Sequence, residues 1–149
     1  MRFEEFMLPS AFRRGLNGTQ EDVMWGLVSA VAEADGISQD HIGLFVKALL
    51  ESPECCQVIG RVAVIGAKGS NDKAAVAGTI GFCNPSLKFD NGVLQSEVDV
   101  VVVLLGDLDR PQCFALAQRT VTQSLSDPAK RGQLEKLCPF SAIPAIFST

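Results

Sequence analysis

The chain has few side chains suited to nucleophilic or metal chemistry, and its single histidine, His41, is the first of them. One imidazole excludes a zinc site built on three histidines, and any serine or cysteine triad would have to use this ring. His41 follows Asp40 at the start of an expected helix, where the positive end of the helix dipole disfavours an imidazolium. We therefore interpret His41 as an ordinary surface residue.

The cysteines are odd in number and show no C-x-x-C spacing, so the sequence indicates free thiols rather than a disulfide framework or a metal centre. They are Cys55, Cys56, Cys83, Cys113 and Cys138. Cys83 and Cys113 fall in apolar segments, which favours buried positions. Cys55 and Cys56 fall in an expected loop, and a functional role for them is open. If that loop forms an open rim, both thiols should react quickly in the native protein.

The composition is that of a globular protein without a nucleic-acid or membrane signature. Of the 149 residues, 47% are hydrophobic, and 17 acidic side chains face 13 basic ones, which suits one domain with a substantial core. The basic residues are scattered rather than clustered. The longest apolar run, 98–105, is far shorter than the roughly 20 residues that span a bilayer. The N-terminal segment is acidic, unlike a signal peptide, so we expect a cytoplasmic protein.

The common phosphate-binding and nucleophile motifs are absent. The segment GAKGS at 66–70 is similar in composition to a phosphate loop, but no register of it yields G-x-x-x-x-G-K-[ST]. Neither G-x-G-x-x-G nor G-x-S-x-G occurs. Motifs alone therefore assign no catalytic residue, no metal ligand and no cofactor site.

Helical spacing dominates the first third of the chain. Thr19 is expected to cap a helix that ends at 35–36, and Ser38 to cap a second helix that stops at 52–53. Each helix carries apolar residues at i, i+3, i+4 and i+7, which predicts one buried stripe. The stripe residues are Met24, Leu27, Val28 and Val31 in the first helix, and Ile42, Phe45, Val46 and Leu49 in the second.

Short β-rich segments bounded by glycine follow the helix pair. Segments 62–66 and 76–83 are predicted strands. Segment 87–90 runs into Asn91-Gly92, a pair that favours a hairpin turn, and the chain then returns into 98–105. That last run is apolar on both faces, which is typical of a central strand covered by helices on each side.

Two further helices are predicted after the central strand. Pro111 suits the first turn of a third helix, and Asp127-Pro128 starts a fourth helix that Pro139 limits. The expected stripe residues of the third helix are Phe114, Ala117, Val121 and Leu125. The last ten residues allow no assignment. The order of elements predicts one α/β domain over 1–149, a mixed β-sheet with its central strand at 98–105 and helices on both faces.

Several of these segments together resemble one bacterial family. They are the helix pair at 19–51, AVAGTIGFCNPSLKFD at 75–90, EVDVVVVLL at 97–105 and the helix at 111–125. They are similar to the enzyme IIA domains of the mannitol/fructose type of the phosphoenolpyruvate-dependent phosphotransferase system (PTS), including the nitrogen-related branch. The similarity extends over nearly the whole chain. It implies the α/β fold of these domains and a bacterial protein connected with sugar transport or nitrogen regulation.

The catalytic segment of that family is altered in this chain. Family members read approximately R-E-x-x-G-S-T-G-I-G-x-G-I-A-I-P-H, and the final histidine accepts a phosphoryl group from the carrier protein HPr. The corresponding segment 50–66 reads LESPECCQVIGRVAVIG. Glu51 matches the family's glutamate. Leu50 stands at the arginine position, Cys55-Cys56 at the Ser-Thr pair and Gly66 at the histidine position.

These changes remove the groups on which phosphotransfer depends in the family. Glycine has no nucleophile, and the loss of the arginine removes a charge suited to a phosphoryl group. Thiols are also weaker hydrogen-bond donors than hydroxyls. We therefore predict a vestigial pocket without catalytic residues. Its members are Glu51, Cys55, Cys56, Gly66, Ala67 and Lys68.

Three functions remain open from the sequence. The leading prediction is a non-catalytic regulatory or protein-binding module of enzyme IIA fold, with a PTS component or a regulated protein as partner, and with a homodimer also open. The second is an active phosphocarrier that uses Cys55, Cys56 or His41 as acceptor, although nearby Glu51 and Glu54 disfavour a low thiol pKa. The third is an anion-binding domain of related fold. No cofactor, nucleic-acid partner or membrane insertion is expected.

Overall fold

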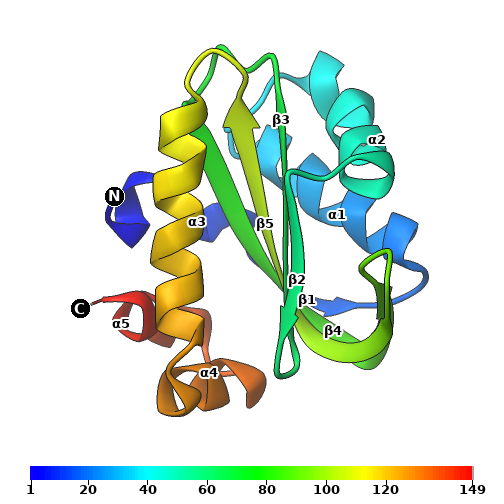
Figure 1. Cartoon of the computed structure of the whole chain (residues 1–149), viewed down its shortest axis with the longest axis vertical. Helices are drawn as coiled ribbons and strands as arrows, with labels where there is room; N and C mark the ends of the chain where they lie inside the picture. The colour runs from blue at the N-terminus through cyan, green and yellow to red at the C-terminus, as the bar shows by residue number, and fades with distance from the viewer. Residues whose placement is uncertain (149) are drawn as a thin grey trace.

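The computed structural model describes residues 1–148, which form a mixed five-stranded sheet with helices on both faces (Figure 1). The strands are β1 (Arg13–Leu16), β2 (Cys55–Ile59), β3 (Val62–Gly69), β4 (Val76–Asp90) and β5 (Gln95–Asp107). Their order in the sheet is β1-β4-β5-β3-β2. β3 runs parallel to β5 and β1 parallel to β4, whereas the other two pairs are antiparallel. The predicted central strand at 98–105 is confirmed, since it lies within β5.

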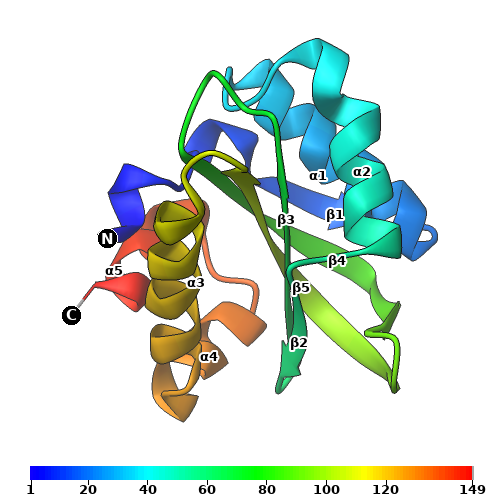
Figure 2. The same ribbon diagram turned by 45° about the horizontal axis from the view of Figure 1, so that its top comes forward.

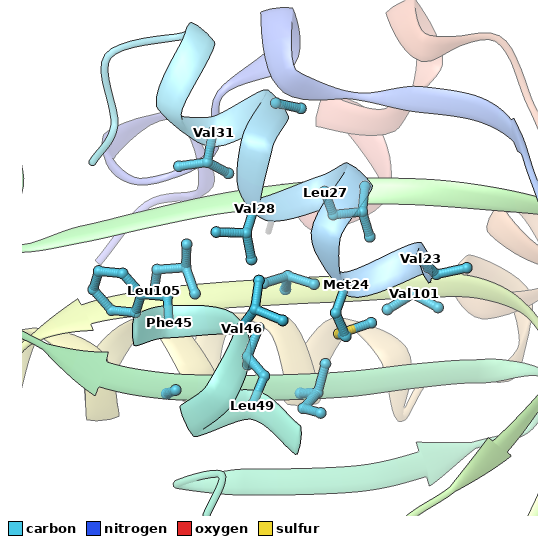
Figure 3. Close-up of a cluster of buried hydrophobic side chains, with 14 of the residues drawn as sticks. Val23, Met24, Leu27, Val28, Val31, Phe45, Val46, Leu49, Val101 and Leu105 are labelled. Atoms are coloured by element: carbon cyan, nitrogen blue, oxygen red, sulfur yellow. The ribbon is translucent and has the colours of Figure 1, made fainter. Parts of the chain in front are cut away.

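One face of the sheet is covered by α1 (Gln20–Glu33) and α2 (Ile42–Glu51). The predicted cap of α1 is confirmed: the Asp22 backbone N–H donates to the Thr19 hydroxyl at 3.1 Å, and the Thr19 N–H donates to the Asp22 carboxylate at 2.9 Å. Figure 3 shows the stripes of both helices directed toward the strand that carries Val101 and Leu105. Burial of these apolar side chains is the main force that holds the helix pair on the sheet.

The second helix begins later than predicted. Residues 39–41 form a 3-10 turn, and α2 starts only at Ile42. The predicted cap by Ser38 is wrong, because its side chain makes no capping hydrogen bond and its backbone carbonyl instead accepts from the His41 N–H at 3.0 Å. His41 occupies the N-cap position of α2 and is half-buried.

The opposite face is covered by α3 (Pro111–Leu125), α4 (Pro128–Glu135), α5 (Ile143–Phe147) and the N-terminal turns. The start of α3 at Pro111 and its buried stripe are as predicted. Asp127 caps α4, with its carboxylate accepting from the Ala129 N–H at 2.9 Å. Phe3 and Phe147 stack with their ring centroids 4.8 Å apart, so the two ends of the chain lie together (Figure 1). Within residues 1–148 no helix is long and apolar enough to cross a membrane.

The strand predictions are confirmed for three of the five strands. β3 extends the predicted strand at 62–66 to Gly69, and β4 and β5 form the hairpin that Asn91-Gly92 indicates, with Gly92 at φ 92°. β4 continues past the predicted 76–83 strand to Asp90, with an irregular register between Phe82 and Leu87. The edge strands β1 and β2 were not among the predicted elements.

Candidate functional site

The β2–β3 hairpin holds most of segment 50–66, in which the resemblance expects the family's catalytic residues. Cys55 on β2 pairs with Gly66 on β3. The Glu54 backbone N–H donates to the Gly66 carbonyl at 2.8 Å, just before β2 begins. Two residues beyond Gly66, the Lys68 ammonium lies 3.7 Å from the Glu54 carboxylate. The structure therefore gathers Cys55, Gly66 and Lys68 of the predicted pocket around one end of the hairpin.

The adjacent cysteines lie on a strand, so their predicted placement in an open loop is wrong. Successive side chains of a strand point to opposite faces of the sheet. Cys55 is buried in the apolar cluster beneath α3, whereas the half-buried Cys56 packs against the cluster beneath α1 and α2. The two thiols consequently cannot act together on one ligand from one side of the sheet.

The environment of both thiols disfavours the thiolate form. Burial raises the pKa of Cys55 to about 12, and the charges of Cys56 and Glu54 add to the shift. Burial also raises the pKa of Cys56, with a contribution from Asp90. Because the thiolate is the reactive species, both groups are weak nucleophiles at neutral pH.

The space in front of Gly66 is filled by a phenylalanine ring from α3. A Cβ atom on residue 66 would lie 2.6 Å from Cζ and 2.9 Å from Cε2 of Phe114, and 3.0 Å from the backbone carbonyl of Leu104. Gly106 on β5 receives the same ring, since a Cβ atom there would lie 2.7 Å from Cδ2 of Phe114. Phe114 is only 4% exposed. The two glycines thus form a seat for Phe114, at the place where the resemblance expects the histidine side chain.

Phe114 is a site residue that the sequence reasoning assigned only to the core stripe of the third helix. The sequence held a signal for this contact, because glycine inside a strand often marks a close approach by another group. Gly66 and Gly106 both carry that signal. Which ring approaches them depends on how α3 lies across the sheet, and no local pattern contains that information.

The remaining members of the predicted pocket lie apart from this seat. Ala67 is fully buried and belongs, like Cys56, to the α1/α2 face. Glu51 is exposed at the last turn of α2. His41 is the N-cap residue of α2, which covers the sheet face opposite to the α3 face on which Gly66 opens. Among residues 1–148, no group of three or more His, Cys, Asp or Glu side chains is arranged to hold a metal ion.

Comparison with known proteins shows the fold. No family model matches the sequence, and no curated protein does either. Solved structures match nearly the full chain. The nitrogen regulatory protein IIA-Ntr from Neisseria meningitidis superposes with a TM-score of 0.72 at 12% identity, covering 97% of each chain. The mannitol-specific cryptic phosphotransferase enzyme IIA CmtB from Escherichia coli superposes with a TM-score of 0.71 at 11% identity, covering 97% of this chain and 96% of the other.

This chain therefore has the α/β fold of PTS enzyme IIA domains, and the resemblance expected from its sequence is confirmed at the level of the fold. The structural neighbours include a nitrogen regulatory protein and a mannitol-specific enzyme, so one fold serves both kinds of protein. A shared fold does not transfer an activity, which has to be argued from the site.

Proposed function

We propose that this chain is a non-catalytic module of enzyme IIA fold that acts by binding a partner protein. The observation that supports the proposal most strongly is the Phe114 ring against Gly66. In the enzyme IIA domains that the sequence resembles, a histidine at this position accepts the phosphoryl group. Here a side chain at residue 66 would overlap the ring, and a phosphoryl group bound at that place would meet the same obstacle.

The substitute acceptors that the sequence left open are poorly suited to phosphotransfer. Cys55 is buried, and its pKa of about 12 keeps it protonated near neutral pH. Cys56 and His41 lie on the opposite face from the Phe114 seat, so neither can replace a side chain at residue 66 in its original place. These positions favour the non-catalytic reading over an active phosphocarrier.

The surface beside the seat retains groups suited to a protein contact. Leu108 follows β5 with 58% of its surface exposed, and its N–H donates to the Gly69 carbonyl at 3.0 Å. The ammonium group of Lys68 and the guanidinium group of Arg110 flank the same ends of β3 and β5. Both cations are paired with carboxylates, Lys68 with Glu54 and Arg110 with Asp107. An exposed aliphatic side chain beside such ion pairs is suited to anchor a partner protein through apolar contact.

A phosphotransfer assay tests the loss of catalysis. The purified chain is incubated with phosphoenolpyruvate, enzyme I and HPr, and an active enzyme IIA domain in the same tube serves as the positive control. Intact-mass measurement should show a phosphoryl group on the control and none on this chain. Stable phosphorylation of this chain that disappears in Cys56→Ser or His41→Ala would overturn the proposal.

A binding assay tests the surface, with HPr as the probe for a PTS partner. We expect HPr to bind this chain saturably in a calorimetric titration, and we expect Leu108→Glu to weaken that binding. Leu94→Glu is the matched control, because Leu94 is equally aliphatic and exposed but lies at the tip of the β4–β5 hairpin. Equal weakening by both variants, or no binding of HPr, would count against this surface as a site for a PTS partner. Saturable binding of phosphate, bicarbonate or a sugar phosphate would instead favour the anion-binding alternative.

A further inference from the structure

A cavity lies between the second half of α3 and the two ends of the described chain. Its volume is about 590 Å³, and small-molecule sites typically measure about 300–1,000 Å³. Figures 1 and 2 both show the N-terminal turn Phe3–Glu5 and α5 beside α3, and these three elements contact one another. The buried, stacked rings of Phe3 and Phe147 are among the lining groups. The cavity therefore has an apolar base.

A largely buried hydroxyl group in this cavity has no partner in the protein. Ser124 lines the cavity and is only 7% exposed, yet its hydroxyl forms no hydrogen bond within residues 1–148. Thr120 and Thr122 of the same helix each donate to the carbonyl four residues earlier. Buried polar side chains usually have a partner. The Ser124 hydroxyl is consequently available to donate to an oxygen of a bound ligand.

Two cations at the cavity have no carboxylate partner within residues 1–148. The guanidinium group of Arg119 forms neither a hydrogen bond nor an ion pair there. The half-buried Lys130 ammonium donates to the Ser148 carbonyl at 3.0 Å, which leaves two of its three N–H groups. Of the described lining residues only Glu4 is acidic, and its carboxylate lies 3.6 Å from Nε of Arg2. The lining thus carries an excess of positive charge.

The apolar and the cationic groups lie toward different ends of the cavity. Leu116, Thr120 and Ser124 are four residues apart, so they share one face of α3 over about 12 Å of helix. Leu116, at the upper end in Figure 1, is 44% exposed. Lys130 lies toward the Ser124 end, because α4 follows the end of α3 (Figure 1). The cavity is therefore suited to a ligand with one anionic end and one apolar end.

We propose that this cavity binds a small organic anion, in which a carboxylate or phosphate head is joined to an apolar group. The head accepts hydrogen bonds from the Ser124 hydroxyl and the Lys130 ammonium, and Arg119 supplies the second positive charge. Oxyanions accept several hydrogen bonds at once, and bonds from charged donors are the stronger ones. The apolar group extends toward Leu116 over the stacked phenylalanine rings. This site is separate from Leu108, which does not line the cavity.

Titrations of the full chain with octanoate and with octyl phosphate, followed by backbone amide chemical shifts, test the proposal. The extended chains of both probes are similar in length to the stretch from Leu116 to Ser124. At least one probe should bind saturably with a Kd below about 10 mM, and the shifts should centre on the second half of α3 and on α5. Octanol lacks the anionic head and acetate lacks the apolar group, so neither should bind saturably. The preferred probe identifies the head group.

Two variants assign the binding to the named groups. Ser124→Ala removes the hydroxyl at a helical position that tolerates alanine, and it should weaken binding about fivefold. Arg119→Gln should weaken binding about threefold, which is the effect of one exposed charge. The matched control is Lys47→Gln on α2, because Lys47 is also an exposed helical cation without an ion pair within residues 1–148. It should leave the affinity unchanged.

Several results would overturn the proposal. They are an absence of saturable binding of both anions, equal binding of octanol, shifts confined to other parts of the chain, or equal weakening by Lys47→Gln and Arg119→Gln. Binding that Ser124→Ala leaves intact would also contradict it. HPr binding can be measured on the same variants. Because the two sites share no residue, a failure of this proposal leaves the proposed protein-binding function standing, and the reverse also holds.

Discussion

On both faces of β3 a phenylalanine ring packs against glycine, but the contact is closer on one face than on the other. On the α1/α2 face, Phe45 lies against Gly69 at the end of the strand, where a Cβ atom would be 3.0 Å from the ring. On the α3 face, Phe114 lies against both Gly66 and Gly106, where a Cβ atom would be 2.6 Å and 2.7 Å from the ring. The face on which the resemblance expects chemistry is thus the more tightly closed one. There the Phe114 ring occupies the space that a side chain at residue 66 or 106 would need.

Removing the ring should have the greatest effect on stability. Phe114→Ala should lower the free energy of unfolding by about 3–5 kcal/mol, because it leaves a cavity over two glycines in a buried layer. Urea denaturation measures this change. Leu116→Ala, at an exposed position of the same helix, should change stability by no more than about 0.5 kcal/mol. A loss below about 1 kcal/mol for Phe114→Ala would mean that the ring is not a structural part of this face.

The next largest effect is expected from adding a methyl group at a glycine, which should destabilise the chain more on the α3 face than on the α1/α2 face. Gly66→Ala should cost about 1–3 kcal/mol, since the new atom meets a buried ring and the Leu104 carbonyl. Gly69→Ala should cost less, because its contacts with Phe45 are longer and a small shift of the ring relieves them. Combining Gly66→Ala with Phe114→Leu should recover part of the loss, which a double-mutant cycle measures. Equal costs at Gly66 and Gly69 would remove the distinction between the faces.

Cys55 and Cys56 lie on opposite faces of the sheet, and their reaction rates should differ accordingly. With a thiol reagent near pH 8, Cys55 should react at least about tenfold more slowly than Cys56, because it is more deeply buried and its pKa is about 12. Labelling followed by peptide mass analysis measures both rates, with urea-unfolded protein as the reference in which they converge. Equal rates in the native protein would contradict the placement of Cys55 beneath α3.

The raised pKa of Cys55 also sets the direction of a pH effect on stability. The neutral thiol is favoured in the folded state, so its stabilising contribution is complete below the ordinary pKa of 9.0 and is lost as the pH rises toward about 12. Cys55→Ser should flatten this alkaline decline in urea denaturation curves. A decline of the same steepness in both proteins would assign it to other groups.

The parts of the fold that could be predicted are those whose pattern is local. The stripes of α1 and α3, the cap at Thr19 and the apolar run of β5 each follow from spacing within one segment. The edge strands do not, because β1 is Arg-Arg-Gly-Leu with Gly15 at φ 66°, and β2 is too short to show alternation. Both become strands by pairing with a longer neighbour, which is a tertiary effect.

The site shows the same division. A glycine where the resemblance expects the acceptor histidine is a difference at one position, Gly66, and the sequence alone displays it. The contact of the Phe114 ring with Gly66 could not be predicted, because Phe114 is distant in sequence and looks like any other stripe residue. The misplaced loop at Cys55-Cys56 has a related cause, since cysteine is a small apolar residue that suits a buried strand as well as a reactive loop.

The smallest change in stability is expected at a glycine with free space around it. That change serves as the reference for the destabilisation expected of Gly66→Ala. Gly132 lies inside α4, and a Cβ atom there would meet nothing within 4 Å. Gly132→Ala should therefore stabilise the chain by up to about 1 kcal/mol, through the higher helix propensity of alanine. The chemical change equals that of Gly66→Ala, but the sign should be opposite. If both variants destabilise in urea denaturation, the loss at Gly66 reflects more than contact with Phe114, and the ring cannot be regarded as the group that closes the site.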